Sequence, residues 1–263
     1  MAPSVLLVMP MRASRTALVA ATGLVTACAL PGPVSSPARG AITPRNGLEV
    51  IGAIKRAHPS RELRSLAFTV RTTEHRASGE RLRVSRSYAR LPGKYRVTRL
   101  PTNLRSGLVR DRQWLSVFER GQRVASVRRL DLSTLLAYDV FAQSLDTTLI
   151  WLDSARVRFG IARRDYFEGK DVWVVGAEDG DSRSTQFWVD AFRWRLVRVI
   201  QRDPRSPDDV LDTWFTEFQE YLDVPIPVRS VTYRNGRLAE TNEISQVTVN
   251  PRLSARNFDL NRF

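Results

Sequence analysis

The ten residues 231–240, VTYRNGRLAE, place Asn235-Gly236 between two runs of apolar and β-branched side chains. Asn-Gly suits a two-residue hairpin turn, because both central residues of that turn need a positive φ. Further turn signals separate apolar runs along the chain, at Ser78-Gly79, Pro92-Gly93, Arg120-Gly121, Glu168-Gly169 and Asp179-Gly180. The sequence therefore predicts an antiparallel meander of about ten strands.

The runs between these turns have the pattern of strands. Residues 66–71 alternate with a period of two, which predicts a strand with one buried face. Residues 172–175 and 187–189 are apolar on both faces, which is typical of strands that are covered on both sides. A sheet with such strands is expected to bend around other elements.

Two segments have helical spacing instead. Asn46 followed by Glu49 resembles a capping box, and the apolar residues after it predict a helix over 46–58. A second helix is predicted within 130–152, with Asp131 or Ser133 as its cap. The expected fold is mainly β: a strongly bent antiparallel sheet, an unclosed half-barrel, wrapped over two or three short helices.

The N-terminal segment is typical of an export signal. Arg12 and Arg15 precede twelve apolar residues, 16–27, which are too few to span a bilayer. The residues just before and at Cys28 resemble a bacterial lipobox, which predicts lipid attachment to that cysteine. An ordinary signal peptide with a chance cysteine near its cleavage site is the alternative.

The rest of the chain divides into two parts. Residues 28–45 contain four prolines among small and polar residues, so they predict a flexible tether behind a lipoprotein signal at 1–27. Residues 46–263 then form one folded domain. This order predicts an envelope location, with the domain facing the periplasm and held at a membrane by its anchor.

The composition argues against most catalytic chemistry. Cys28 is the only cysteine and there are two histidines, without the spacing of a metal site, so neither a metal nor a cofactor is expected. The common nucleophile and dinucleotide motifs are absent, which favours a protein that is not an enzyme. The formal charge is +14, but nucleic-acid binding conflicts with the export signal.

Large apolar side chains are the remaining candidates for function. A bent sheet over short helices leaves a cavity unless side chains fill it, and an apolar cavity suits a lipid. We expect Leu136→Glu to impair acyl-chain binding without unfolding the domain. The cavity candidates are Trp114, Phe118, Leu135, Leu136, Phe141 and Trp188.

Taken in order, four short motifs resemble the LolA/LolB family of lipoprotein carriers and receptors. They are LPGKYRVTR at 91–99, LVRDRQWLSVF at 108–118, QFWVDAFRWRLVRV at 186–199 and VTVNPRLSARNFDL at 247–260. The resemblance covers most of residues 46–260. It departs from the family at Asp111-Arg112, where the family often has Asp-Gly.

The resemblance implies an apolar cavity that shelters acyl chains of lipoproteins or lipids, without catalysis or cofactor. LolB-like receptors are lipoproteins, as Cys28 predicts here, and Ala29 after it favours outer-membrane sorting. Such receptors also carry a protruding loop with an exposed leucine, a part that Leu104 could play. A sensor or scaffold that binds a protein partner, such as another carrier or envelope protein, with the same half-barrel is the alternative.

Overall fold

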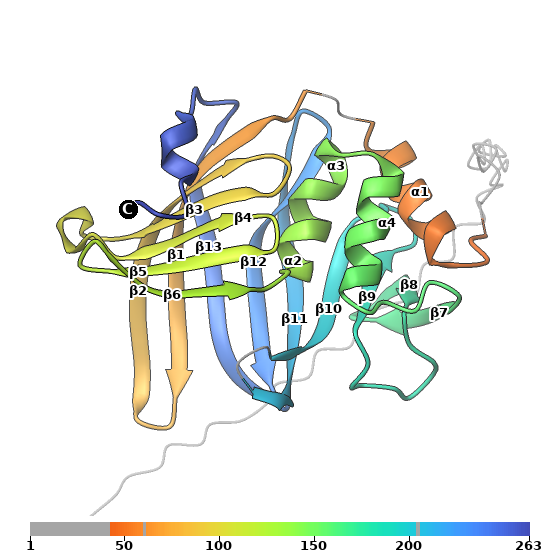
Figure 1. Cartoon of the computed structure of the whole chain (residues 1–263). Coiled ribbons are helices and arrows are strands. Elements are labelled where there is room, and N and C mark those ends of the chain that lie inside the picture. The colour runs from red at the N-terminus through yellow and green to blue at the C-terminus, as the bar shows by residue number, and fades with distance from the viewer. Residues whose placement is uncertain (1–42, 60–61, 204–205) are drawn as a thin grey trace, which may run out of the picture. The chain divides into compact units, whose positions relative to one another are not determined.

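The structure is a computed structural model that describes residues 43–263 except 60–61 and 204–205 (Figure 1). The predicted signal, Cys28 and the tether up to residue 42 lie outside the described residues. Within the described ranges, no helix is long and apolar enough to cross a membrane.

The described chain forms one antiparallel sheet of thirteen strands that is not closed, with β6 and β7 at its two edges (Figure 1). The predicted fold class is therefore confirmed. In spatial order the strands are β6 (Gln122–Arg128), β5 (Trp114–Glu119), β4 (Gly107–Asp111), β3 (Lys94–Arg99), β2 (Gly79–Arg90), β1 (Ser65–Arg76), β13 (Arg237–Val249), β12 (Val224–Arg234), β11 (Ser206–Tyr221), β10 (Leu196–Asp203), β9 (Gln186–Asp190), β8 (Lys170–Val175) and β7 (Ala162–Phe167).

The hairpin at Asn235-Gly236 is confirmed. It joins β12 to β13, and its two central residues have φ of 48° and 77°, as a type I′ turn requires. The count of about ten strands was too low, partly because two hairpin turns lack glycine. Arg112-Gln113 joins β4 to β5 and Leu222-Asp223 joins β11 to β12, with Arg112, Leu222 and Asp223 at positive φ.

The first helix, α1 (Gly47–Ala57), begins where the capping residues predict. The Asn46 side chain accepts a hydrogen bond from the Glu49 backbone N–H, at 3.0 Å. The Glu49 carboxylate accepts from the Arg45 backbone N–H, at 2.9 Å, instead of closing the box on Asn46. The first bond satisfies an N–H group of the first helical turn, where no intrahelical acceptor exists, and the second satisfies an N–H group just before the cap.

The segment 130–152 is two helices rather than one. The first is continuous through α2 (Leu132–Thr134), the π-helical turn η2 (Leu135–Asp139) and α3 (Val140–Ala142), and Asp131 caps it. Gln143 is extended, and Ser144 then caps α4 (Leu145–Ser154) by accepting from Thr147 N–H. Two 3₁₀ turns complete the helical elements, η1 (Thr102–Leu104) and η3 (Ala255–Phe258).

The helices pack on one face of the bent sheet and share its main core (Figure 1). Leu136 and Val140 lie in this core with Ile51 of α1 and Phe187 of β9. Lys55 of α1 ties the break between helices to that core, because its ammonium donates to the carbonyls of Val140 and Gln143 at 2.7 and 2.5 Å. Figure 1 shows that the helices lie over only part of the sheet face.

Candidate functional site

The sheet face that the helices leave uncovered forms a groove of about 830 Å³. The long central strand β1 contributes Phe68, Val70, Thr72, Glu74 and Arg76 to it, as the two-residue period of a strand requires, and His75 joins them near the hairpin. The helical segment closes one end of the groove with side chains that include Tyr138. The groove thus runs from the helices toward the hairpin ends of the long strands.

The end of the groove beside the helices is aromatic. Phe68 and Tyr138 are stacked, with ring centroids 6.2 Å apart and an interplanar angle of 18°. Tyr95 of β3 is 6.4 Å from Tyr138, and Phe215 of β11 lines the same groove. Val70 and Ile244, which are paired across β1 and β13, continue this apolar lining away from the helices.

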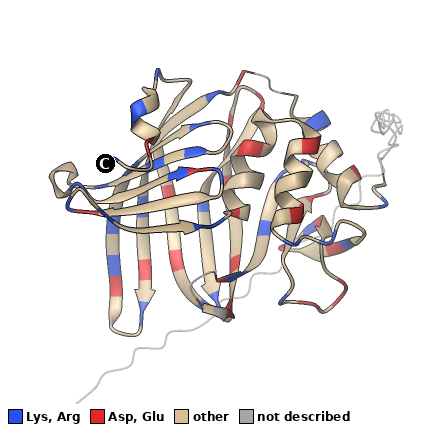
Figure 2. Cartoon of the chain, in the orientation of Figure 1, with Lys and Arg blue, Asp and Glu red and all other residues tan. Residues whose placement is uncertain are grey.

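Further from the helices the lining becomes polar and then charged. Thr72 donates to the Asn242 side chain at 2.7 Å, and the Thr213 and Thr232 hydroxyls lie 3.0 Å apart. Beyond them Arg83 pairs with Glu74 at 2.5 Å. Figure 2 shows charged residues along β1, β2 and β13. The groove therefore has an aromatic end beside the helices, where the paired Arg110 and Asp131 also line it, and a polar end away from them. This arrangement suits an amphiphile.

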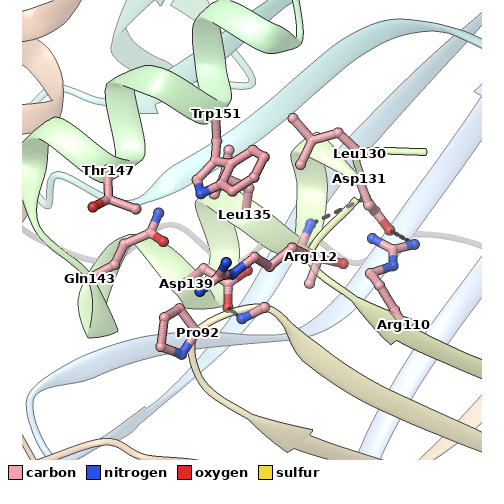
Figure 3. A pocket seen from close by; sticks show the side chains of 12 residues that line it. Pro92, Arg110, Arg112, Leu130, Asp131, Leu135, Asp139, Gln143, Thr147 and Trp151 are labelled. Atoms are coloured by element: carbon pink, nitrogen blue, oxygen red, sulfur yellow. Dashed lines mark hydrogen bonds and ion pairs between the residues drawn. The ribbon is translucent and has the colours of Figure 1, made fainter. Parts of the chain in front are cut away.

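A second, smaller pocket of about 50 Å³ lies between the helices and the turns that flank β3 and β4 (Figure 3). It shares Arg110, Asp131 and Thr134 with the groove. Arg110 and Asp131 form an ion pair at 3.1 Å, so this charged contact lies between the small pocket and the groove. Trp151 of α4 lines the far side of the small pocket.

A buried carboxylate, Asp139, lines the small pocket. It is 6% exposed and accepts hydrogen bonds from Gly93 N–H at 2.9 Å and from the Tyr95 hydroxyl at 2.8 Å. Burial raises the pKa of Asp139 from 3.8 to about 6, although those two hydrogen bonds lower it. The carboxylate thus links the π-helical turn to the β2–β3 hairpin.

We expect Asp139 to make folding stability depend on pH. The folded state keeps the Asp139 proton up to about pH 6, whereas the unfolded chain loses it near pH 3.8. The free energy of unfolding of the wild type should therefore fall, relative to that of Asp139→Asn, by up to about 3 kcal/mol as pH rises from about 4 to 7. Urea denaturation of both proteins across that range measures the difference between their free energies of unfolding. A difference that does not change with pH would contradict the raised pKa of Asp139.

The residues that the sequence nominated as cavity lining lie outside the groove. Leu135, Leu136 and Phe141 are buried in the main core, although Leu135 also lines the small pocket. Trp114 is 49% exposed at the start of β5. Phe118 is buried against Phe263 of the C-terminal segment, with ring centroids 5.2 Å apart.

The prediction for Trp188 is corrected by the parity of β9. Its neighbours Phe187 and Val189 lie in the main core, so Trp188 points to the opposite face of the sheet. There it packs with Val172, Val174 and Val197 in a second apolar cluster. Leu104 lies in η1, between β3 and β4, and is 45% exposed.

On this opposite face, the Arg198 guanidinium is held among aromatic rings. It lies 4.5 Å from the Trp188 ring centroid and 5.7 Å from that of Trp214. It also donates two hydrogen bonds to Asp212, at 2.8 and 2.7 Å. The tryptophans of this face are therefore structural partners of an ion pair.

Sequence reasoning missed the residues that do line the groove. The alternation at 66–71 identified Phe68 and Val70 as one face of a strand, but not which other side chains lie beside them. That requires the strand register, which brings Ile244 from the far end of the chain to Val70. Among the described residues, no group of three His, Cys, Asp or Glu side chains could hold a metal ion.

No protein-family model matches this sequence, and no curated protein matches it. Solved structures do match. A domain from Vibrio parahaemolyticus named for outer membrane lipoprotein sorting has a TM-score of 0.56 at 15% identity, over 82% of this chain and 97% of that one. A LolA superfamily protein from Nitrosomonas europaea has 0.52 at 14%, over 81% and 97%. A DUF1329 family protein from Desulfovibrio piger has 0.53 at 12%, over 81% and 95%. At this identity the likeness concerns the fold, and the chain has a LolA-like fold.

Proposed function

We propose that this protein binds acyl chains of lipoproteins or lipids in the groove and carries or receives them without catalysis. The observation that carries the proposal is the groove itself, about 830 Å³ with an aromatic end formed by Phe68, Tyr95, Tyr138 and Phe215. Its volume lies in the range of small-molecule sites, roughly 300–1,000 Å³. Burial of a chain there would release about 0.8 kcal/mol per CH₂ group.

The proposal includes the place of the protein in the cell. Cys28 would carry a lipid, the tether 28–45 would follow it, and the domain 46–263 would face the periplasm from the outer membrane. The names of two structures with this fold, one for lipoprotein sorting and one for the LolA superfamily, are in keeping with an envelope function. Leu104, exposed in η1, is the proposed point of contact with a membrane during transfer.

Native mass spectrometry of the exported chain tests the proposal. The variant Cys28→Ser removes the proposed site of covalent attachment, so a lipid mass that is lost on denaturation would come from the groove. We expect such a mass in this background. A bare chain that also fails to bind an added pyrene-labelled acyl ester would contradict the proposal, and a copurifying envelope protein would then favour the sensor or scaffold.

A groove-filling substitution is expected to abolish this binding. Val70 is half-buried and lines the groove, so Val70→Trp would place an indole where the chain should lie. The matched control is Arg71→Trp. Arg71 is exposed, and because it follows Val70 directly on the strand, its side chain points away from the groove. We expect at least a tenfold loss of affinity for the pyrene-labelled ester in Val70→Trp only. Circular dichroism checks that both variants fold. Equal binding of the ester by both variants would contradict the placement of the acyl chain in the groove.

A further inference from the structure

One arginine lies in the groove at the boundary between its aromatic and polar ends. In the sheet register Arg99 of β3 pairs with Ser85 of β2, Ser85 with Val70 of β1, and Val70 with Ile244 of β13. All four residues line the groove. Arg99 is half-buried and belongs to the same cross-strand row as two aliphatic residues, Val70 and Ile244.

Four other arginines that line the groove already have acidic partners, and one of them, Arg76, shares Glu74 with Arg83. Arg83 pairs with Glu74 at 2.5 Å, Arg110 with Asp131 at 3.1 Å, and Arg234 with Asp209 at 3.2 Å. Arg99 differs from them. Within the part of the chain that the structure describes, no ion pair or side-chain hydrogen bond involves its guanidinium.

The whole groove also carries a positive surplus. Seven arginines line it against three carboxylates, Glu74, Asp131 and Glu240. A cation in a concave site with apolar walls attracts an anion more strongly than one in open water, because the low-dielectric walls focus its field. Arg99 is therefore the point in the groove at which a negative group of a ligand would gain most.

The surroundings of Arg99 fix how such a ligand would lie. Toward the helices its neighbours are apolar, Val97 on the same strand and Leu108 paired with Val97 on β4, and Phe68 lies beyond them. Away from the helices the lining is polar, beginning with Thr72 and Arg83. A chain directed toward Phe68 would leave its headgroup beside Arg99.

We propose that the groove selects amphiphiles with an anionic headgroup, a carboxylate or a phosphate, which pairs with Arg99 while the acyl chain lies over Val97, Val70 and Phe68. This rests on the proposed acyl-chain binding and adds the headgroup class to it. Guanidinium is the side chain best matched to both anions, because its planar N–H groups donate two parallel hydrogen bonds to adjacent oxygens.

Ligands with one chain and different heads test the proposal. Palmitate, hexadecyl phosphate and hexadecanol compete with the neutral pyrene-labelled acyl ester for the exported chain carrying Cys28→Ser. We expect at least one of the two anions to compete about tenfold more strongly than the alcohol, a preference that corresponds to about 1.4 kcal/mol. The anion that competes better identifies the class of the bound ligand, either a free fatty acid or a lipid with a phosphate headgroup.

Substitutions at Arg99 separate its role from the general charge of the domain. Arg99→Gln is expected to abolish the preference for anions and keep the affinity for hexadecanol, and Arg99→Lys to retain part of the preference. The matched control is Arg86→Gln, because Arg86 pairs with Thr69 on the opposite face of the same hairpin and its guanidinium donates to the Thr69 hydroxyl. This control should keep the wild-type preference.

The failures are distinguishable. If the alcohol and both anions compete equally in the wild type, the headgroup proposal is wrong and the acyl-chain function stands. The same holds if Arg99→Gln keeps the full preference. If the pyrene-labelled ester does not bind at all, the proposed function itself fails. The wild-type comparison needs no variant, so the test remains decisive even if Arg99→Gln does not fold.

Discussion

Leu136→Glu is expected to unfold the domain. Leu136 is 2% exposed in the π-helical turn η2 and belongs to the main core. The substitution would remove an apolar side chain from this core and place a carboxylate there without a partner, which costs several kcal/mol even after the carboxyl is protonated. A loss of about 5 kcal/mol is comparable with the whole stability of many domains.

This expectation replaces the one drawn from the sequence, in which Leu136 lined a cavity and Leu136→Glu spared the fold. Far-UV circular dichroism and urea denaturation measure the effect. The matched control is Leu104→Glu, the same change at a position that is 45% exposed, where a difference within about 0.5 kcal/mol is expected. A folded Leu136→Glu protein that had lost only acyl-chain binding would contradict this expectation and would mean that Leu136 lines the binding site.

The hairpins show how far sequence predicts this fold. Where glycine or asparagine supplies the positive φ, as at Asn235-Gly236, the turn residues alone locate the strand ends. Leu222-Asp223 makes a tight turn of the same kind with neither residue, so only the weaker turn preference of Asp223 marks it in the sequence. Such a turn is maintained by pairing of its flanking strands, β11 and β12, and this pairing is a property of the assembled sheet.

The two helical segments were predicted in position, but the break inside the second one was not. Apolar spacing continues across 130–152, so it indicates helix throughout. In the structure the helix ends at Gln143, which is extended. Ser144 marks the break, because its hydroxyl accepts from Thr147 N–H and starts α4. Lys55 then satisfies the carbonyls of Val140 and Gln143, a tertiary contact across 85 and 88 residues of sequence that no local pattern contains.

The candidate site was the least predictable part, because it depends on which face of each strand turns inward. A run such as Phe187-Trp188-Val189 is apolar on both faces, so its composition cannot say which side chain faces the core. The structure puts Phe187 and Val189 inside, and Trp188 on the other face with Arg198. Aromatic content therefore pointed to the wrong side of the sheet, and only strand register identifies the groove.

The Arg198 cluster is expected to be a major source of stability on that opposite face. The Arg198 and Asp212 side chains are 17% and 18% exposed, and the Trp214 indole N–H also donates to Asp212 at 2.9 Å. Arg198→Met would keep much of the aliphatic packing but leave the Asp212 carboxylate without its cation. Removal of one partner of a largely buried pair costs about 3 kcal/mol, since the remaining charge stays desolvated.

Urea denaturation followed by tryptophan fluorescence measures this loss, because Trp188 and Trp214 both flank the guanidinium.

The matched control is Arg229→Met. Arg229 pairs with Glu217 at 3.2 Å across neighbouring strands, but the two side chains are 44% and 59% exposed, so the cost should stay below about 1 kcal/mol. Adding Asp212→Leu to Arg198→Met should recover part of the stability, since it removes the unpaired charge. Equal losses for the two arginine variants would mean that burial of the Arg198 pair adds nothing, and that the aromatic rings around it act as ordinary apolar surface.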